Sequence, residues 1–228
     1  MALILQLETA TTSCSVALSL DGKTIAFREL SERNAHASHI TLFIREVLEK
    51  AGRTMDELEA VAVSVGPGSY TGLRIGVSTA KGLCFALNIP LIGIETLKTM
   101  TAGLISSGSH NTGNLYCPMI DARRMEVYTA VYNNQLNTVV DIQAKILDSD
   151  SFGDLLATNK IIFFGDGAFK CAGIFNNPNA IILTDFVNSA KDMSGLVLEK
   201  FKKQNFEDVA YFEPFYLKDF LVLKPKGL

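Results

Sequence analysis

The sequence is poor in the residues that build disulfide frameworks and metal centres. Its 228 residues include 4 cysteines and 3 histidines, and no two cysteines have the close spacing of a zinc site or a redox motif. Scattered cysteines of this kind are typical of thiols in a reducing compartment. His36 and His39 lack a third ligand nearby in the sequence, as catalytic zinc would require. We therefore expect neither disulfides nor a metal site.

Membrane segments and a basic surface are also missing. The chain starts in a strand-like segment without a basic leader, and no apolar run approaches the roughly 20 residues that span a bilayer. The net charge of -3 and the pI of about 5.7 leave no excess of lysine and arginine to neutralise phosphates. We expect a cytoplasmic protein that makes no membrane contact and reaches nucleic acid only through a partner.

What the sequence does contain is a meander of strands followed by alternating helices and strands. The Asp21-Gly22 turn joins two of the strands into a hairpin. Apolar residues at three-and-four spacing indicate a helix from His36 to about Gly52, and a second helix ends near residue 87. The expected strands are residues 3–7, 14–20, 23–30, 61–65 and 90–94. This order predicts a mixed sheet covered by helices, whereas a Rossmann topology would alternate from the first strand.

The second half of the chain echoes the first. Residues 115–121 resemble 3–8, and residues 164–169 match 65–70 as a strand end followed by two glycines, a small residue and an aromatic. The hairpins alone could be alike by chance, but the paired glycine turns favour a repeat. We predict an α/β protein of two homologous lobes, residues 1–105 and a reduced lobe of residues 106–228, whose final helix could also pack back on the first lobe.

A glycine-rich turn from Gly66 to Gly72 opens the second predicted helix. Unpaired amides at a helix N-terminus carry partial positive charge and can cradle a phosphate. The turn is not a P-loop, because Leu73 and Arg74 replace the lysine and hydroxyl residue, and its third glycine is one residue too late for a dinucleotide motif. A phosphate site and a turn that merely needs positive φ at its glycines both remain open.

The helix that follows carries a stripe of small residues. Gly72, Gly76 and Ala80 recur at four-residue spacing, and each glycine inside a helix costs about 1 kcal/mol relative to alanine. Such a stripe allows a helix or sheet to approach closely, either inside the lobe or at a subunit interface. Internal packing is the usual outcome in a soluble domain, but the apolar side chains of Leu73, Val77 and Leu87 favour an interface.

No convincing catalytic group emerges from the residues themselves. Glu8 and Asp121 end the equivalent strands of the two halves, at the mouth of the expected cleft. In a nucleotidase such acids would hold Mg²⁺ or position water. The alternative is that they only accept hydrogen bonds from turn amides.

Three segments carry a family resemblance: Leu7–Thr12, Ser15–Leu18 and above all Gly66–Gly76. They resemble the TsaB (YeaZ) family, a glycoprotease-like (Gcp/M22) branch of the actin-like ATPase superfamily. The likeness is close through residue 100 and looser beyond, although Glu213–Leu217 is also typical. It implies a two-lobed actin-like ATPase (RNase H-like) fold. It also implies a non-catalytic subunit that binds and activates TsaD in forming threonylcarbamoyladenosine in tRNAs that read codons beginning with A.

The resemblance also assigns roles to residues. The carboxylate and metal-histidine positions of the catalytic relative TsaD fall on Thr12, Ser13, Thr96 and Met100, which cannot supply those ligands. We therefore expect no catalytic residue, metal or cofactor on this chain, with ATP and metal on the partner subunits. The expected vestigial phosphate site consists of Glu8, Thr9, Thr12, Gly66, Gly68 and Ser69. The expected partner face consists of Gly72, Leu73, Gly76, Val77, Ala80 and Leu83.

The family further implies partners and leaves rivals. TsaE, an ATPase, would dock on the pair with TsaD, and a homodimer could form where the partner is absent. The rival enzyme hypothesis is an ATP-dependent phosphotransferase of the same fold. A Rossmann-like dinucleotide binder would need parallel strands from the first element onward.

Overall fold

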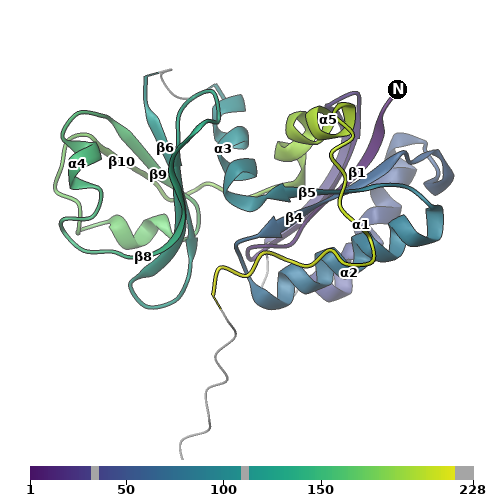
Figure 1. The fold of residues 1–228 in the computed structure, drawn as a ribbon, viewed down its shortest axis with the longest axis horizontal. Helices are drawn as coiled ribbons and strands as arrows, with labels where there is room; N and C mark the ends of the chain where they lie inside the picture. The colour runs from purple at the N-terminus through teal and green to yellow at the C-terminus, as the bar shows by residue number, and fades with distance from the viewer. Residues whose placement is uncertain (32–35, 109–112, 219–228) are drawn as a thin grey trace, which may run out of the picture.

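The computed structural model describes residues 1–31, 36–108 and 113–218 and contains two sheets, each with its own helices (Figure 1). The first sheet consists of β1 (Leu3–Glu8), β2 (Ser13–Leu20), β3 (Lys23–Ser31), β4 (Ala60–Gly66) and β5 (Leu91–Glu95). The second consists of β6 (Leu115–Asp121), β7 (Glu126–Tyr132), β8 (Thr138–Ile146), β9 (Ile161–Phe164) and β10 (Ala180–Leu183). The α-helices are α1 (His36–Ala51), α2 (Tyr70–Leu87), α3 (Thr96–Ser106), α4 (Gly153–Leu156) and α5 (Ser194–Lys202). The 3₁₀ helices are η1 (Met55–Glu57), η2 (Ala168–Cys171) and η3 (Ala190–Met193).

The second sheet repeats the first strand by strand. The first has the order β3-β2-β1-β4-β5 and the second, seen in the same sense, β8-β7-β6-β9-β10. In both, the opening three strands are antiparallel and the remaining pairs are parallel. This confirms the two-lobed, actin-like α/β prediction with a mixed sheet in each lobe.

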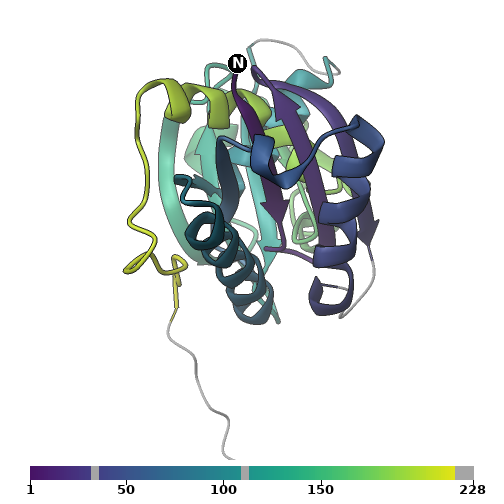
Figure 2. The same ribbon diagram turned by 90° about the vertical axis from the view of Figure 1, so that its right-hand side faces the viewer.

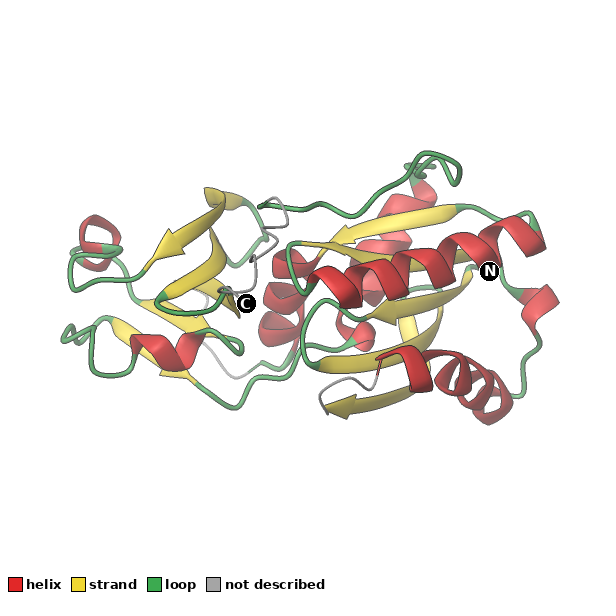
Figure 3. Ribbon diagram, turned by 90° about the horizontal axis from the view of Figure 1, so that it is seen from below, coloured by secondary structure: helices red, strands yellow, loops and turns green. Residues whose placement is uncertain are grey.

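The second lobe is reduced in its crossovers, as predicted. The 16-residue α1 and the 18-residue α2 follow β3 and β4, whereas only the four-residue α4 and the four-residue η2 follow β8 and β9. Figure 3 shows long helices lying over the strands of one lobe and only short ones in the other. The first lobe therefore has a much thicker layer over its sheet.

Strand β1 is buried along its whole length because both faces of its sheet are covered. Leu5 and Leu7 belong to the cluster under α1 and α2, where Ile44 and Val47 of α1 also pack. Ile4, on the opposite face, packs in the cluster with α5. This alternation along the strand follows from the period of two of an extended chain.

The C-terminal segment lies against the first sheet. Met193 and Val197 are buried together with Ile92 of β5, so η3 and α5 cover the face opposite α1 and α2 (Figure 1). The chain then runs along the β5 edge (Figure 2), where the Glu207 amide donates to the Leu91 carbonyl at 2.9 Å. Further on, the Phe215 amide donates to the Val65 carbonyl at 2.7 Å. The edge strand β5 is thereby partly covered by the chain's own tail.

Helix α3 joins the two lobes. Met100 and Leu104 pack with Tyr116 and Phe164 of the second sheet, while Gly103 lies against Asp192 of η3. Across the described residues, every helix is too short or too polar to cross a bilayer.

Candidate functional site

The glycine turn is held by the chain's own carbonyls. The Ser69 amide donates to the Ala10 carbonyl at 2.7 Å, and the Ser69 hydroxyl caps α2 by accepting from the Gly72 amide at 3.2 Å. A side chain at Gly68 would place its Cβ 2.4 Å from the Ala10 oxygen, so this approach requires glycine. The structure thus brings Thr9, Gly68 and Ser69 of the predicted phosphate site together. The amides of Ser69 and Gly72, at the start of α2, already donate hydrogen bonds within the chain.

Glu8, at the end of β1, is fully buried. Its Oε1 accepts from the Ala10 amide at 2.6 Å, and its Oε2 accepts from the Ser64 hydroxyl. Burial raises the pKa of the Glu8 carboxyl, and the hydrogen bonds from Ser64 and Ala10 partly oppose that rise. Both carboxylate oxygens therefore accept hydrogen bonds from the same lobe, and solvent does not reach them in this conformation.

Asp121, at the equivalent end of β6, is neutralised by a lysine. The Lys170 ammonium forms an ion pair with Asp121 Oδ1 and also donates to the Glu126 carbonyl at 2.7 Å. The Lys170 side chain is only 5% exposed, and the Arg123 amide adds a hydrogen bond to Asp121 of 2.7 Å. The ammonium therefore supplies the positive charge that a metal ion would otherwise provide at this carboxylate.

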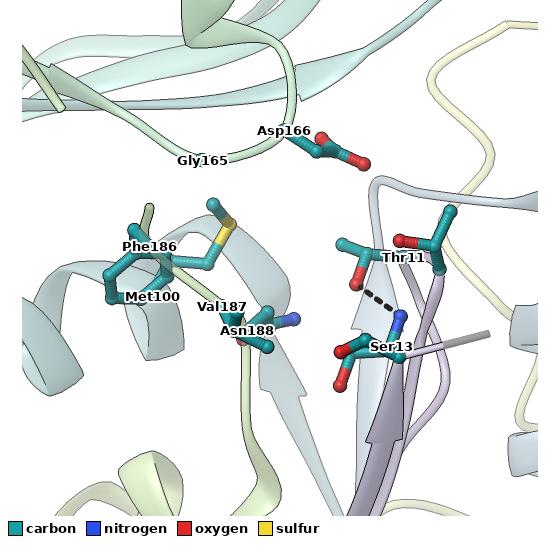
Figure 4. A pocket seen from close by; sticks show the side chains of 10 residues that line it. Thr11, Ser13, Met100, Gly165, Asp166, Phe186, Val187 and Asn188 are labelled. Carbon is teal, nitrogen blue, oxygen red and sulfur yellow. Dashed lines mark hydrogen bonds between the residues drawn. The ribbon is translucent and has the colours of Figure 1, made fainter. Parts of the chain in front are cut away.

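A cavity of about 110 Å³ lies between the lobes (Figure 4). Its lining comes from the β1–β2 turn, the glycine turn after β9, α3 and the connection after β10; the residues are Thr11, Thr12, Ser13, Ser31, Met100, Gly165, Asp166, Phe186, Val187 and Asn188. Thr12 of the predicted phosphate site is among these lining residues. The volume is well below the roughly 300–1,000 Å³ of pockets that enclose nucleotide-sized ligands.

Metal-binding side chains are not clustered in the part of the chain that the structure describes. No group of three or more His, Cys, Asp or Glu side chains there could hold an ion. His39 contacts Phe43 at 5.6 Å between ring centroids and pairs with the Ser38 hydroxyl. The side chain of His36 and the whole of His110 are outside the described residues. Thr96 is buried, and Met100 turns its side chain into the inter-lobe cavity.

The predicted partner face of α2 is corrected by the structure. Its members Gly72, Leu73, Gly76, Val77 and Ala80 are buried against the first lobe's own sheet, and Leu83 is partly buried with them. A Cβ on Gly76 would lie 2.3 Å from Thr9 Oγ1, which itself donates to the Gly72 carbonyl at 2.8 Å. The small-residue stripe therefore lets α2 approach the end of β1, and these residues, apart from the partly buried Leu83, are covered by the lobe itself.

The opposite face of α2 is open. Phe85 is 84% exposed, which is exceptional for a phenylalanine. Gly82 lies one turn before it with free space above its Cα, and the neighbouring Ala86 is also exposed. Exposed aromatic side chains such as this one are enriched at protein interfaces.

Several residues of the site were not predicted from the sequence. Asn188 lies in a connection without any motif, and Lys170 reaches Asp121 across 49 residues. The sequence indicates Asp166 only as part of the second glycine turn. The tail residue Phe215 meets the first glycine turn: a Cβ on Gly66 would lie 2.5 Å from its carbonyl oxygen. Only the Gly165–Gly167 repeat gave a usable signal, because it marks the position equivalent to Gly66–Gly68.

Comparison with known proteins assigns the chain to a family. The family model described as "TsaD: tRNA N6-adenosine threonylcarbamoyltransferase" matches residues 29–220. The chain is 30% identical over 223 residues to the tRNA threonylcarbamoyladenosine biosynthesis protein TsaB of Escherichia coli, covering 95% of this chain and 94% of that protein.

Two solved structures share the fold. YeaZ from Pseudomonas aeruginosa matches with a TM-score of 0.83 at 24% identity, covering 95% of this chain and 100% of that one. The activator of 2-hydroxyisocaproyl-CoA dehydratase from Clostridium difficile, solved with bound ADPNP, matches with a TM-score of 0.51 at 8% identity, covering 89% and 96%. At these identities the likeness concerns the fold alone.

Proposed function

The chain belongs to the TsaB group of tRNA threonylcarbamoyladenosine biosynthesis proteins, within the family that the TsaD model defines, and we propose that it is the non-catalytic subunit that binds and activates TsaD. In this role it serves the formation of threonylcarbamoyladenosine in tRNAs that read codons beginning with A. ATP and metal are held by the partner subunits, TsaE docks on the assembled pair, and tRNA is contacted only through the complex. The complex works in the cytoplasm.

The observation that carries the proposal is the engagement of both cleft acids. Glu8 accepts hydrogen bonds from the Ser64 hydroxyl and the Ala10 amide, and Asp121 forms an ion pair with the ammonium of Lys170. Holding Mg²⁺ at either carboxylate would require breaking these contacts, and Mg²⁺ binds through carboxylates and substrate phosphates. The small inter-lobe cavity leaves too little room for a nucleotide in this conformation. These features favour a binding role over the phosphotransferase alternative.

The exposed face of α2 is our proposed contact with TsaD. Phe85 has the properties of an interface anchor, because a rigid aromatic side chain gains much buried area on binding. The absence of a side chain at Gly82 leaves room for a partner helix to approach. The same face could pair two copies of this chain when TsaD is missing.

The proposal is tested by reconstituting tRNA modification with purified TsaD and TsaE, with and without this chain. We expect threonylcarbamoyladenosine formation to depend on the chain, and Phe85→Asp to weaken TsaD binding by about thirtyfold or more, as for a hot-spot aromatic. Phe169→Asp, at an exposed phenylalanine of the second lobe, is the matched control and should bind normally. Full complex formation by Phe85→Asp would reject this interface, and turnover of ATP or tRNA by the chain alone would reject the non-catalytic role.

A further inference from the structure

Within the described part of the chain, the inter-lobe cavity contains buried polar atoms that make no hydrogen bond of normal geometry. Asn188 is 4% exposed and Ser13 is 2% exposed. Over the described residues, neither polar atom of the Asn188 carboxamide nor the Ser13 hydroxyl makes a hydrogen bond of normal geometry, although Asn188 approaches Glu8 closely enough to lower the pKa of that carboxyl. Figure 4 shows the Asn188 side chain projecting across the cavity towards Ser13. Both side chains line the same space.

Polar groups buried in this way favour an occupant of the cavity. A buried group without a hydrogen-bond partner costs about 1–3 kcal/mol, so such groups are normally paired with water or a ligand. A volume of about 110 Å³ is larger than one water requires and accommodates several waters or one small molecule. The cavity is therefore able to hold a ligand of a few non-hydrogen atoms.

The charge of the lining selects the kind of ligand. Asp166 lies across the cavity from Ser13, and its Oδ1 accepts from the Asp121 amide at 3.0 Å. Burial raises the pKa of the Asp166 carboxyl, which indicates a carboxylate with little solvation. None of the lining residues is basic, and the nearby Lys170 is already paired with Asp121. An anion is thus disfavoured, and a positively charged group would relieve the Asp166 charge.

The remaining wall is apolar. Met100, Phe186 and Val187 lie beside the polar residues (Figure 4). Carbon-rich walls suit a hydrocarbon segment better than a bare inorganic ion, whose hydration shell they cannot replace. A ligand that matches all three walls has a cationic end, a short apolar middle and a hydrogen-bonding end.

We propose that this cavity binds a small organic amine, with its ammonium group at Asp166 and a hydroxyl or amide group at Ser13 and Asn188. The hydrocarbon middle lies along Met100 and Phe186. Because residues of both sheets' connections line the cavity, binding holds the two lobes in the arrangement seen here. The site is independent of the proposed interaction with TsaD, since it lies between the lobes and not on α2.

The probe is 2-aminoethanol, titrated into the full isotope-labelled chain and followed by amide chemical shifts. We expect saturable shifts at Gly165, Asp166 and Asn188. Ethylamine, which lacks the hydroxyl, should bind several-fold more weakly, and propan-1-ol, which lacks the ammonium group, should bind at least about tenfold more weakly because it loses a hydrogen bond to a charged group. Acetate should give no saturable shift. Saturable binding of acetate, or no saturable shift with 2-aminoethanol because water alone fills the cavity, would overturn the proposal.

Variants test the assigned contacts. Asp166→Asn keeps the shape and the acceptor for the Asp121 amide and should weaken 2-aminoethanol binding at least about tenfold. Asp154→Asn, at an exposed acid of α4, is the matched control and should not change it. Ser13→Ala, a small change at the other end, should weaken binding several-fold and provides a test if the Asp166 variant does not fold. Unchanged affinity in a folded Asp166→Asn protein would reject the site.

Discussion

The two lobes have the same strand order but neutralise the equivalent acid in different ways. In the first lobe Glu8 is fully buried at the end of β1 and accepts hydrogen bonds from Ser64 and the Ala10 amide. In the second lobe Asp121 stays partly exposed and pairs with Lys170 from η2. Glu8 is out of reach of water and is held by neutral donors, whereas Asp121 lies at a more open end of its lobe, where a charged partner is effective.

The glycine turns differ in a parallel manner. Both donate an amide to the neighbouring strand region: Ser69 to Ala10 at 2.7 Å, and Gly167 to Met119 at 3.0 Å. Gly66 and Gly165, which begin the two turns, both have positive φ. Only the first turn continues into a long helix that is packed tightly against the end of β1. A shared backbone geometry is therefore followed by a tightly packed helix in the first lobe and forms part of the cavity wall in the second.

The largest effect is expected from adding a methyl group where the long helix α2 packs against the end of β1, a contact that the described part of the second lobe lacks. A Cβ at residue 72 would lie 2.0 Å from the Thr9 carbonyl oxygen, and backbone atoms cannot give way easily. We expect Gly72→Ala to lower the free energy of unfolding by about 3 kcal/mol, measured by urea denaturation. Gly82→Ala, in open space on the same helix, is the control and should raise it by about 0.5–1 kcal/mol. Equal effects of the two variants would contradict the close packing.

The second test removes the lysine of the second lobe. Lys170→Met keeps the length of the side chain but leaves Asp121 without its counter-charge and the Glu126 carbonyl without a donor. We expect a loss of about 2 kcal/mol in the free energy of unfolding, less than for a fully buried pair because solvent reaches Asp121. Lys203→Met, which removes an exposed pair with Glu199, should change it by no more than about 0.5 kcal/mol. A similar small change for Lys170→Met would mean that the second lobe does not depend on its ion pair.

Neutralising Glu8 in the first lobe should stabilise the protein, whereas removing Lys170 in the second lobe should destabilise it. The pKa of Glu8 is raised in the folded protein, so the contribution of this carboxyl to stability is largest below the ordinary pKa of a glutamate and is lost as the pH rises through the raised pKa. Glu8→Gln keeps an acceptor for the Ala10 amide and should remove this fall, giving a melting temperature a few degrees above that of the unmodified protein at pH 8. Thermal unfolding between pH 4 and 8 measures it.

The control for this pH dependence is Glu49→Gln, at an exposed glutamate of α1. It should leave the pH profile unchanged. If Glu8→Gln retains the same fall in stability with pH, the carboxyl of Glu8 is not the group responsible.

The smallest effect concerns the contact between the tail and the second lobe. Lys218 forms an ion pair with Glu126, and its side chain is about half exposed. We expect Lys218→Ala to lower the free energy of unfolding by no more than about 0.5 kcal/mol, because exposed ion pairs are weak and screened by salt. A loss above 2 kcal/mol in the same urea experiment would show that this contact holds the lobes together.

Much of the fold was predictable because its signals are local. The expected strands at residues 3–7, 14–20 and 23–30 differ from β1, β2 and β3 by one residue at an end, since alternation and turn chemistry mark them directly. The repeat of the glycine turn at Gly165–Gly167 predicted the second lobe. The Gly72–Ala80 stripe was predicted to be a partner interface, but it is buried within the lobe. Spacing along a helix identifies a face but not what covers it.

The order of the strands and helices, the two lobes and the family can be predicted from the amino-acid sequence, because these depend on patterns within short segments. The packing of the folded chain sets which face of α2 is free, how Glu8 and Asp121 are neutralised, and that Asn188 and Ser13 line one cavity. These outcomes depend on contacts between residues far apart in the chain. A shift of one residue in the pairing of two strands would change which side chains meet.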